Sequence, residues 1–379
     1  MGCEPPWADA KTGKVVHVVG HVTDEVFSFL GPATSALAHS GLEQAVVMID
    51  DMRYRHRLPN LHESAELVLT PAMRNPVKQW RAVLRACRAA LASGPLHAVH
   101  LHGILPCLVG ASAVRAAGLQ ARLLYSPHGS RSLDRLRTIG ALAVFLIRPL
   151  LGPLRSAAIV TVPREALVFE SWESVALVES PVSEVFHKVP RSESRHPLIV
   201  TGGRIQSARS VELFAQLAVL LSDEDLRISF KWFGTVDAAS RLRLTAANVG
   251  VFDVASDAEC ASQLAAGWMY IALDGTRGFP PFLAAAMAAG LPCVATDCTP
   301  HRELIRDGET GFLCQCERDM IGRIAALIDS PTLRARVGTA AREEAKRRFG
   351  ESRFSASLLA AYAVNAVDLE GVGVLGVRN

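Results

Sequence analysis

The sequence predicts an α/β protein built from two doubly wound domains, and three observations lead to this prediction. The chain has 379 residues, more than one hydrophobic core usually serves. Short β-branched runs alternate with helix-like segments, as in parallel sheets covered by helices. The alternation stops in a polar, proline-containing stretch at residues 182–197, which we interpret as a linker, and then starts again.

In the first half, the alternation begins at residue 15. The expected strands cover residues 15–19, 45–49, 97–102 and 121–125, with helical segments between them near residues 77–92 and 109–117. The last of these strands runs into the turn Ser126-Pro127-His128-Gly129. Ligands of such sheets bind beyond the carboxyl ends of the strands, so chemistry is expected there.

The second half repeats this rhythm. Its expected strands begin at residue 198 and continue at residues 228–233, 249–254, 269–273 and 292–296, with helices at residues 211–221, 238–246, 260–266 and 281–289. A charged helix follows at residues 331–349, and a last apolar helix covers residues 354–364.

The composition is that of a folded protein without an obvious charged partner. Half of the residues are apolar and the formal net charge is +3, which argues against a disordered tail and against a chain that coats nucleic acid. The eight cysteines show no paired metal-binding spacing, so we expect reduced thiols and no metal. No secretory signal precedes the first apolar run, and the longest apolar stretch, residues 139–151, is shorter than the roughly 20 residues of a membrane span, so a cytoplasmic protein is expected.

The most informative motif starts at Gly278-Phe279-Pro280 and continues as an alanine-rich helix from Pro281-Phe282. Proline suits the first turn of a helix, where its missing N–H costs nothing. The free amides and the positive dipole end of such a helix can bind phosphate. The alternative is a helix that only fills the core.

A second motif follows the strand at residue 198. Gly203 and Arg204 lead to Arg209 five residues later. Arginines placed here could meet the charge that develops on a departing diphosphate, and their planar forks can contact two phosphate oxygens. The alternative is a pair of solvated arginines on a turn.

Together the two motifs resemble the donor site of the family 4 retaining GT-B glycosyltransferases, and the resemblance covers most of the chain. It implies two Rossmann-like domains facing across a cleft, a nucleoside-diphosphate-sugar as co-substrate, and no cofactor or metal. The implied divisions are residues 1–187 as the acceptor-side domain, 188–352 as the nucleotide-sugar domain, and 353–379 as a helix that crosses back to the first domain and a tail.

Two positions depart from the family pattern. The resemblance implies carboxylates that contact the donor sugar and the ribose where this chain has Arg277 and Ala285. Three explanations stay open: a donor such as a uronic acid that suits arginine, replacement by Glu303 or Asp274, or loss of transfer activity. Glu303 stands where the family also often has glutamate.

In the first half, the resemblance implies that His128 faces the sugar, either stabilising charge at the reacting carbon or orienting the acceptor. A structural histidine is the alternative. We expect His100 and His102 to line the cleft. A zinc site formed by these three histidines is a hypothesis that we do not favour, because the sequence fixes no geometry for them.

Two arginine-rich segments bear on the acceptor: residues 53–57, and the surroundings of residues 139–151 with Arg131, Arg135, Arg137, Arg148 and Arg155. A basic and apolar surface would suit a polyprenyl-linked acceptor and a peripheral contact with the inner membrane face. A buried helix with ordinary solvated charges explains the same residues equally well. Nucleic acid is a poor partner, because stacking aromatic residues are not regularly interleaved with these arginines, although Tyr54 stands between two of them.

The expected function is therefore transfer of a sugar to a glycan or lipid-linked acceptor in bacterial surface polysaccharide synthesis. The competing hypothesis is a non-catalytic protein of the same fold that binds or regulates an active transferase. The departures at Arg277 and Ala285 are its main support.

Overall fold

The computed structural model describes residues 13–20, 22–118, 121–128, 156–166, 169, 174–203, 207–222, 227–254, 256–273 and 279–363. These residues form two compact units, with the division at Pro181. The helix from Glu351 to Ala363 belongs to the first unit, apart from its first residue. Each unit is described by itself.

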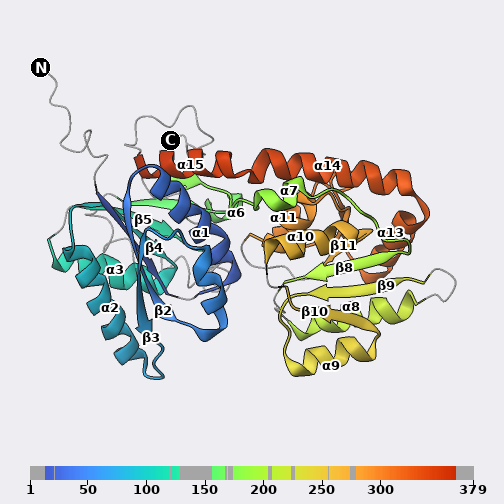
Figure 1. The fold of residues 1–379 in the computed structure, drawn as a ribbon, viewed down its shortest axis with the longest axis horizontal. Helices are drawn as coiled ribbons and strands as arrows, with labels where there is room; N and C mark the ends of the chain where they lie inside the picture. The colour runs from blue at the N-terminus through green and yellow to red at the C-terminus, as the bar shows by residue number, and fades with distance from the viewer. Residues whose placement is uncertain are drawn as a thin grey trace, which may run out of the picture. The chain divides into compact units, whose positions relative to one another are not determined.

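The first unit contains a seven-stranded sheet with the order β3-β2-β1-β4-β5-β6-β7 (Figure 1). All of its neighbouring strands pair in parallel. The strands are β1 (Lys14–Val19), β2 (Glu43–Asp50), β3 (Ala65–Pro71), β4 (Leu96–His102), β5 (Arg122–Ser126), β6 (Ser156–Val160) and β7 (Val175–Leu177). Because all pairs are parallel, the carboxyl ends of all seven strands lie at one edge of the sheet.

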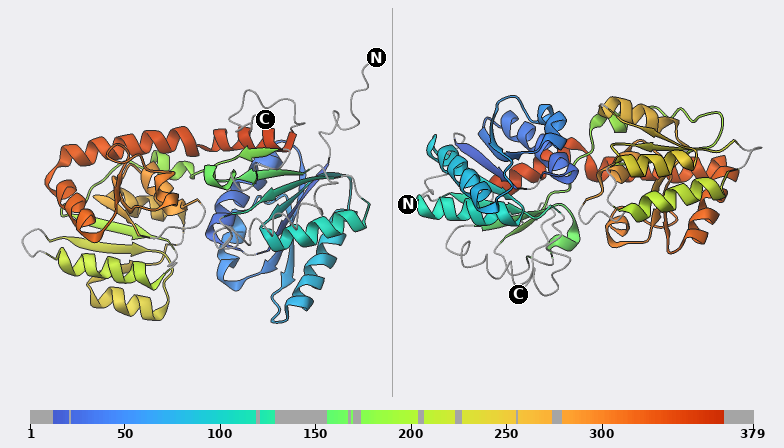
Figure 2. Two further views of the ribbon diagram at one scale, coloured as in Figure 1. Left: turned by 180° about the vertical axis from the view of Figure 1, so that it is seen from behind. Right: turned by 90° about the horizontal axis from the view of Figure 1, so that it is seen from below.

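Helices cover both faces of this sheet (Figures 1 and 2). They are α1 (Asp24–His39), the 3-10 helix η1 (Met52–Asn60), α2 (Pro76–Ala92), α3 (Ile104–Ala116), α6 (Pro163–Ala166) and α15 (Glu351–Ala363). Side chains of β1 alternate between the faces: Val16 and Val18 pack in a cluster with α2 and α3, whereas Val15 packs in a cluster with α1 and α15. Phe354 and Leu358 of α15 are fully buried there, so the end of the chain completes the core of the first unit.

The second unit contains a six-stranded sheet with the order β10-β9-β8-β11-β12-β13, again parallel. Its strands are β8 (Leu198–Gly202), β9 (Ser229–Phe233), β10 (Val249–Phe252), β11 (Met269–Ala272), β12 (Cys293–Thr296) and β13 (Phe312–Cys314). Its helices are α7 (Glu184–Lys188), α8 (Ala208–Leu220), α9 (Ala238–Ala246), α10 (Asp257–Ala266), α11 (Pro281–Ala288), α12 (Thr299–Arg302), α13 (Glu317–Asp329) and α14 (Pro331–Phe349).

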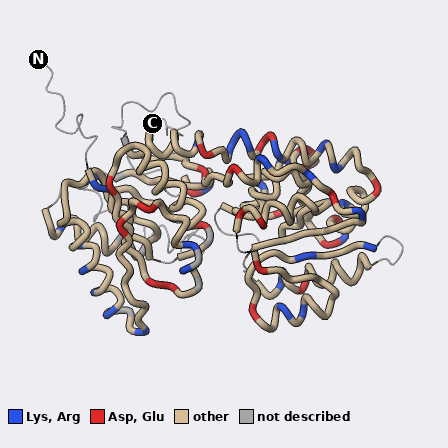
Figure 3. The backbone as a smooth tube through the Cα atoms, in the orientation of Figure 1, with Lys and Arg blue, Asp and Glu red and all other residues tan. Residues whose placement is uncertain are grey.

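Helix α14 carries charges of both signs along its length (Figure 3). Its buried side contacts α11 through a pair of glycines. A Cβ built on Gly338 would lie 2.3 Å from the carbonyl oxygen of Gly290, whose φ of 77° is in the left-handed region. Gly290 therefore combines a positive φ with a close backbone approach, and both require glycine.

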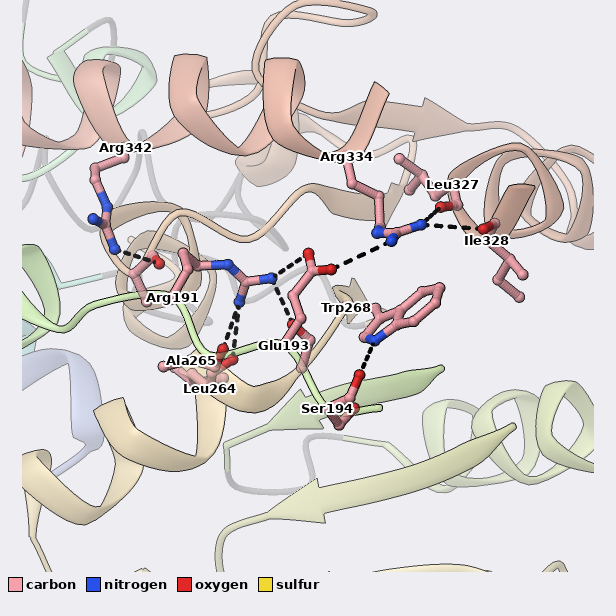
Figure 4. A network of polar contacts seen from close by, with 12 residues as sticks. Arg191, Glu193, Ser194, Leu264, Ala265, Trp268, Leu327, Ile328, Arg334 and Arg342 are labelled. Carbon is pink, nitrogen blue, oxygen red and sulfur yellow. Dashed lines mark hydrogen bonds and ion pairs between the residues drawn. The ribbon is translucent and has the colours of Figure 1, made fainter. Parts of the chain in front are cut away.

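The polar stretch at residues 181–197 is bound to the second unit (Figure 4). Arg191 donates to the carbonyl oxygens of Ala265 at 3.0 Å and Gly267 at 2.7 Å, and it pairs with Glu193. Glu193 also pairs with Arg334, whose guanidinium lies 3.8 Å from the ring centroid of Trp268. What the sequence suggests as a linker is therefore a fixed part of the second unit.

The predicted α/β class is confirmed, and most predicted strands lie within one or two residues of the observed ones. The sequence analysis misses β3, β6, β7 and β13. None of the described helices has the length and apolar character needed to cross a membrane.

Candidate functional site

The carboxyl ends of β8 and β9 in the second unit present bare backbone. Gly203 and Gly234 follow these strands with φ values of 110° and 130°. A Cβ built on Gly234 would lie 2.7 Å from the carbonyl oxygen of Gly203, so a side chain cannot fit without moving the backbone. The amide of Gly203 donates to the carbonyl of Phe233 at 2.8 Å and holds the two turns together.

Two aromatic side chains hold the end of β8 in place by hydrogen bonds to its backbone. Trp232 donates its indole N–H to the carbonyl of Gly203 at 3.1 Å, and Tyr270 donates its hydroxyl to the carbonyl of Gly202 at the same distance. Because both carbonyl groups are engaged, the strand end is held in one conformation.

The start of α11 lies against these turns. The ring of Phe282 is so close that a Cβ on Gly202 would lie 3.0 Å from it, and one on Gly203 would lie 3.1 Å from it. The helix begins after Pro280 with Pro281 in its first turn and has no side-chain cap. The amides of Phe282 and Leu283 are therefore not used by a capping side chain. A helix end of this kind favours anions.

The predicted residues of this motif take different positions. Phe279 and Pro280 are buried, Pro281 and Phe282 are half-buried, and Ala285 is 7% exposed within α11. Arg277 and Gly278 lie outside the described residues, as does Asp274.

Arg209 is the described cation of the second predicted motif. It is exposed in the first turn of α8, two residues after the capping residue Ser207. Arg204 lies outside the described residues. Since α8 follows β8, Arg209 stands at the same edge of the sheet as Gly203.

Glu303 follows α12 and is half-buried. Its carbonyl oxygen accepts a hydrogen bond from Arg348 at 2.8 Å. Compensation by Glu303 for the missing carboxylates stays a hypothesis.

In the first unit, His128 lies two residues beyond the end of β5. Its φ of 47° is in the left-handed region, which a side chain other than glycine adopts at some cost. The residue is 6% exposed, and its Nε2 lies 2.8 Å from Nδ1 of His102. The ring of Phe29 packs edge-on against it.

His102 and His100 are core residues, with exposures of 1% and 0%. The prediction that they line an open cleft is therefore wrong. His102 Nε2 lies 3.1 Å from Nδ1 of His17, a residue of β1 that the sequence analysis did not single out. His100 contacts the hydroxyl of Tyr362 at 2.6 Å through Nδ1 and that of Ser126 at 2.8 Å through Nε2.

Burial keeps these imidazoles neutral. It lowers the pKa of His17 to about 4 and that of His128 to about 3, and it holds the pKa values of His100 and His102 well below the ordinary value. Nitrogens of His17, His100 and His102 lie within 4.8 Å of one another, which is the spacing of a group that could bind a metal. Both nitrogens of His100 already have hydrogen-bond partners, however, and binding would break one of these bonds.

Known proteins resemble this chain in sequence and in fold. Residues 196–330 match the sequence model of the family "Glycosyl transferases group 1". The structure of HepE from Anabaena, in complex with UDP and glucose, superposes with a TM-score of 0.75 over 92% of this chain and 99% of that chain, at 13% identity. The chain has a GT-B fold.

Curated relatives match over shorter stretches. Spore coat protein SA of Bacillus subtilis (strain 168) is 34% identical over 83 residues, which cover 21% of this chain and 22% of that protein. EpsD of the same bacterium is 44% identical over 69 residues, 18% of each chain. The matches thus span about a fifth of the length of these relatives.

The structure of this GT-B protein describes only the first of the two arginine-rich segments. In the first segment, Arg55 makes a two-pronged ion pair with Asp50, and Tyr54 is buried. About half of the Arg55 side chain stays exposed in this ion pair, and contact of this segment with an anionic surface stays a prediction. The second segment, from Arg131 to Arg155, lies outside the described residues.

Proposed function

We propose that this protein is a glycosyltransferase that moves a sugar from a nucleoside-diphosphate-sugar to a glycan or lipid-linked acceptor. The observation that carries the proposal is the bare backbone edge of β8 and β9 beside the uncapped start of α11, with Arg209 exposed at the same edge. The family model that matches this region, and the UDP bound to HepE, support a nucleotide-sugar as the donor.

In the proposed reaction, the amides at the start of α11 hold the diphosphate, because they carry a partial positive charge and have no capping side chain. Arg209, together with Arg204, stabilises the negative charge that develops as the diphosphate leaves. His128 contacts the sugar that is transferred. The proposal includes retention at the anomeric carbon, a hexose donor, and an acceptor in bacterial surface polysaccharide synthesis at the inner membrane face.

The second candidate is a non-catalytic protein of the same fold that binds or regulates an active transferase. One observation favours it: Ala285 is buried in α11 and offers no hydrogen bond where the family resemblance implies a carboxylate. The loss of a charged hydrogen bond of about 1.5–3 kcal/mol would weaken donor binding by roughly one to two orders of magnitude.

The two candidates differ in turnover. The purified protein is tested with UDP, GDP, UDP-glucose, UDP-N-acetylglucosamine, UDP-glucuronate and GDP-mannose, first by thermal stabilisation and then by release of nucleoside diphosphate. A ligand that binds the native state raises the melting temperature. The transferase proposal expects one nucleotide class to stabilise the protein and one sugar to be turned over, while stabilisation by none of the six compounds would contradict it.

The variant Ala285→Glu sharpens the test, with Ala285→Gln as a control of equal size and no charge. If the site has decayed, Glu increases turnover or donor affinity by about tenfold or more and Gln does not. If Arg277 recognises an acidic sugar, UDP-glucuronate is the preferred donor of the unmodified protein and Glu at position 285 gives no gain.

A further inference from the structure

Four buried side chains form a line across four neighbouring strands of the first sheet. Gln44 lies on β2, His17 on β1, His102 on β4, and His128 directly beyond β5. In the register of the sheet, each lies two residues nearer the carboxyl edge than the one before it. A step of two residues keeps all four on one face. We call these four residues the relay.

A neutral imidazole has one N–H donor and one acceptor nitrogen. Burial lowers the pKa of each of the three histidines of the relay far enough to keep it neutral at pH 7. If one ring nitrogen donates, the other must therefore accept. When two such rings share a hydrogen bond, the donor and acceptor roles in one ring also determine those in the other.

Gln44 sets the donor-to-acceptor direction of the hydrogen bonds, at the end of the relay farthest from the carboxyl edge of the sheet. Its amide nitrogen donates to the carbonyl oxygen of Thr34 at 2.8 Å. A carbonyl can only accept, so the amide cannot be reversed, and Oε1 of Gln44 is left as an acceptor. Burial lowers the pKa of His17, and the Gln44 side chain acts in the opposite direction, as expected when an acceptor oxygen faces the ring.

The remaining atoms agree with this direction. Among the described residues, Nε2 of His17 and Oε1 of Gln44 are both buried, and neither has a hydrogen-bond partner within the ordinary limits of distance and angle. Since Oε1 of Gln44 can only accept and the Gln44 side chain acts on this ring, a proton on Nε2 of His17 is the arrangement that suits both atoms. His17 therefore carries its proton on Nε2 and accepts through Nδ1. At 3.1 Å from that Nδ1, the Nε2 of His102 is the donor.

The same argument continues to the edge of the sheet. His102 has used its N–H, so its Nδ1 accepts from Nε2 of His128 at 2.8 Å. The last nitrogen, Nδ1 of His128, then carries a lone pair. It is buried and has no partner in the part of the chain that the structure describes.

We propose that the relay holds His128 as its Nε2–H tautomer, so that its Nδ1 accepts a hydrogen bond from a hydroxyl group of the donor sugar. Gln44, His17 and His102 are positioning residues, and His128 is the residue that touches the substrate. The identity of the ligand rests on the proposed function, whereas the tautomer is a property of the protein without ligand.

A metal ion is the competing occupant of this cluster, because nitrogens of His17, His100 and His102 lie within 4.8 Å of one another. The hydroxyl of Ser126 donates to the carbonyl of Ile159 at 2.8 Å, so it accepts from Nε2 of His100. Nδ1 of His100 then accepts from Tyr362. Both nitrogens of His100 are thus satisfied by hydrogen bonds, which favours the relay over a metal.

The first test measures the histidine tautomers in the ligand-free protein by two-bond ¹H–¹⁵N correlation NMR at pH 7. The relay expects His17, His102 and His128 all protonated at Nε2. Protonation of His128 at Nδ1 overturns the proposal, and so does one equivalent of zinc per chain in protein purified without chelator.

The second test removes the acceptor oxygen of Gln44, which sets the direction of the hydrogen bonds in the relay. Gln44→Met keeps the length of the side chain but takes away Oε1, and His128 is expected to become a mixture of tautomers. Tyr362→Phe is the matched control, since it removes a buried hydrogen bond of the same cluster outside the relay and leaves His128 at Nε2–H. If Gln44→Met does not fold, the tautomers of the unmodified protein still decide the question.

The third test adds ligand. UDP-glucose, UDP-N-acetylglucosamine, UDP-glucuronate and GDP-mannose are each compared with the matching nucleoside diphosphate. The proposal expects the Nδ1 resonance of His128 to move with a sugar nucleotide and not with the diphosphate alone. Under Gln44→Met, kcat/KM is expected to fall about three- to tenfold, the effect of one neutral hydrogen bond.

A sugar nucleotide that binds without moving the Nδ1 resonance overturns the substrate contact. If none of the four binds, the proposed function fails, while the tautomers measured without ligand still stand. The two failures are therefore distinguishable.

Discussion

The two units present polar atoms beyond their strands in different ways. In the first, a buried histidine follows β5, and neighbours on three other strands fix its hydrogen bonding. In the second, β8 and β9 are followed by glycines whose amides are bonded to neighbouring strands, and the start of α11 offers amides without a capping side chain at the edge where Arg209 is exposed. The first unit should therefore be sensitive to protonation, and the second to added side-chain volume.

The largest expected effect of this difference is acid unfolding of the first unit. Burial lowers the pKa of His17 to about 4 and that of His128 to about 3, whereas an unfolded histidine titrates near 6.5. Below that value the unfolded chain binds more protons than the folded one, so stability falls as the pH falls. Each of these two residues costs about 2 kcal/mol by pH 5, and His100 and His102 act in the same direction.

Hydrogen exchange at pH 7 and pH 5, compared at equal intrinsic exchange, checks this. Protection of β1 and β4 should fall at pH 5, while β8 and β11 lose less. Equal loss in both sheets would show that the histidine cluster does not control acid stability.

The second effect concerns the backbone edge. Gly234→Ala places a Cβ 2.7 Å from the carbonyl oxygen of Gly203 at a φ of 130°, so the strand end must move. We expect a loss of stability of more than about 2 kcal/mol and a loss of UDP or GDP binding. Calorimetric titration and urea unfolding measure the two quantities.

Gly308→Ala is the matched control. Gly308 also has a positive φ, of 76°, but no atom lies within 4 Å of the built Cβ. It should lose about 1–2 kcal/mol of stability through strain alone and keep nucleotide binding. If Gly234→Ala binds nucleotide with the original affinity, the carboxyl ends of β8 and β9 are not part of the nucleotide site.

Arg209→Gln comes next. If Arg209 contacts the diphosphate, the dissociation constant for the nucleoside diphosphate rises about 10- to 100-fold, with little change in melting temperature. Arg227→Gln is the control, since Arg227 is also exposed but lies before β9, at the opposite edge of the sheet. Isothermal titration of both variants decides the matter, and equal affinities would exclude a phosphate contact by Arg209.

The smallest effect has the opposite sign. Gly322 lies within α13, and a Cβ there would meet open space. Gly322→Ala should raise stability by about 0.5–1 kcal/mol, the helix propensity difference between the two residues. If the variant is instead less stable in thermal unfolding, glycine is required at position 322 within α13, as well as at the ends of the strands.

The parts of the fold that the sequence predicts share one property. Strands such as β1, β8 and β12 are buried on both faces, and most of their residues are therefore apolar. β3 lies at the edge of its sheet, where Leu67 and Leu69 are each 38% exposed, and its pattern is too mixed to recognise. β7 and β13 have three residues each, too few for any periodicity.

The candidate site divides in the same way. Gly203, Pro281 and Arg209 belong to local motifs, so their spacing along the chain is enough to predict them. His17 is a single histidine in a valine-rich strand, and its relation to His102 and His128 depends on the register between strands. That register is set by pairing over long sequence distances, which a local pattern does not contain.

The ion pairs and hydrogen bonds of Arg191 and Glu193 have a practical consequence for recombinant fragments. The family match begins at residue 196, and a fragment cut there would leave the carbonyl groups of Ala265 and Gly267, and the indole N–H of Trp268, without the partners that residues 191–194 provide. A fragment of the second unit for crystallisation should therefore start at Pro181, where the compact unit itself begins.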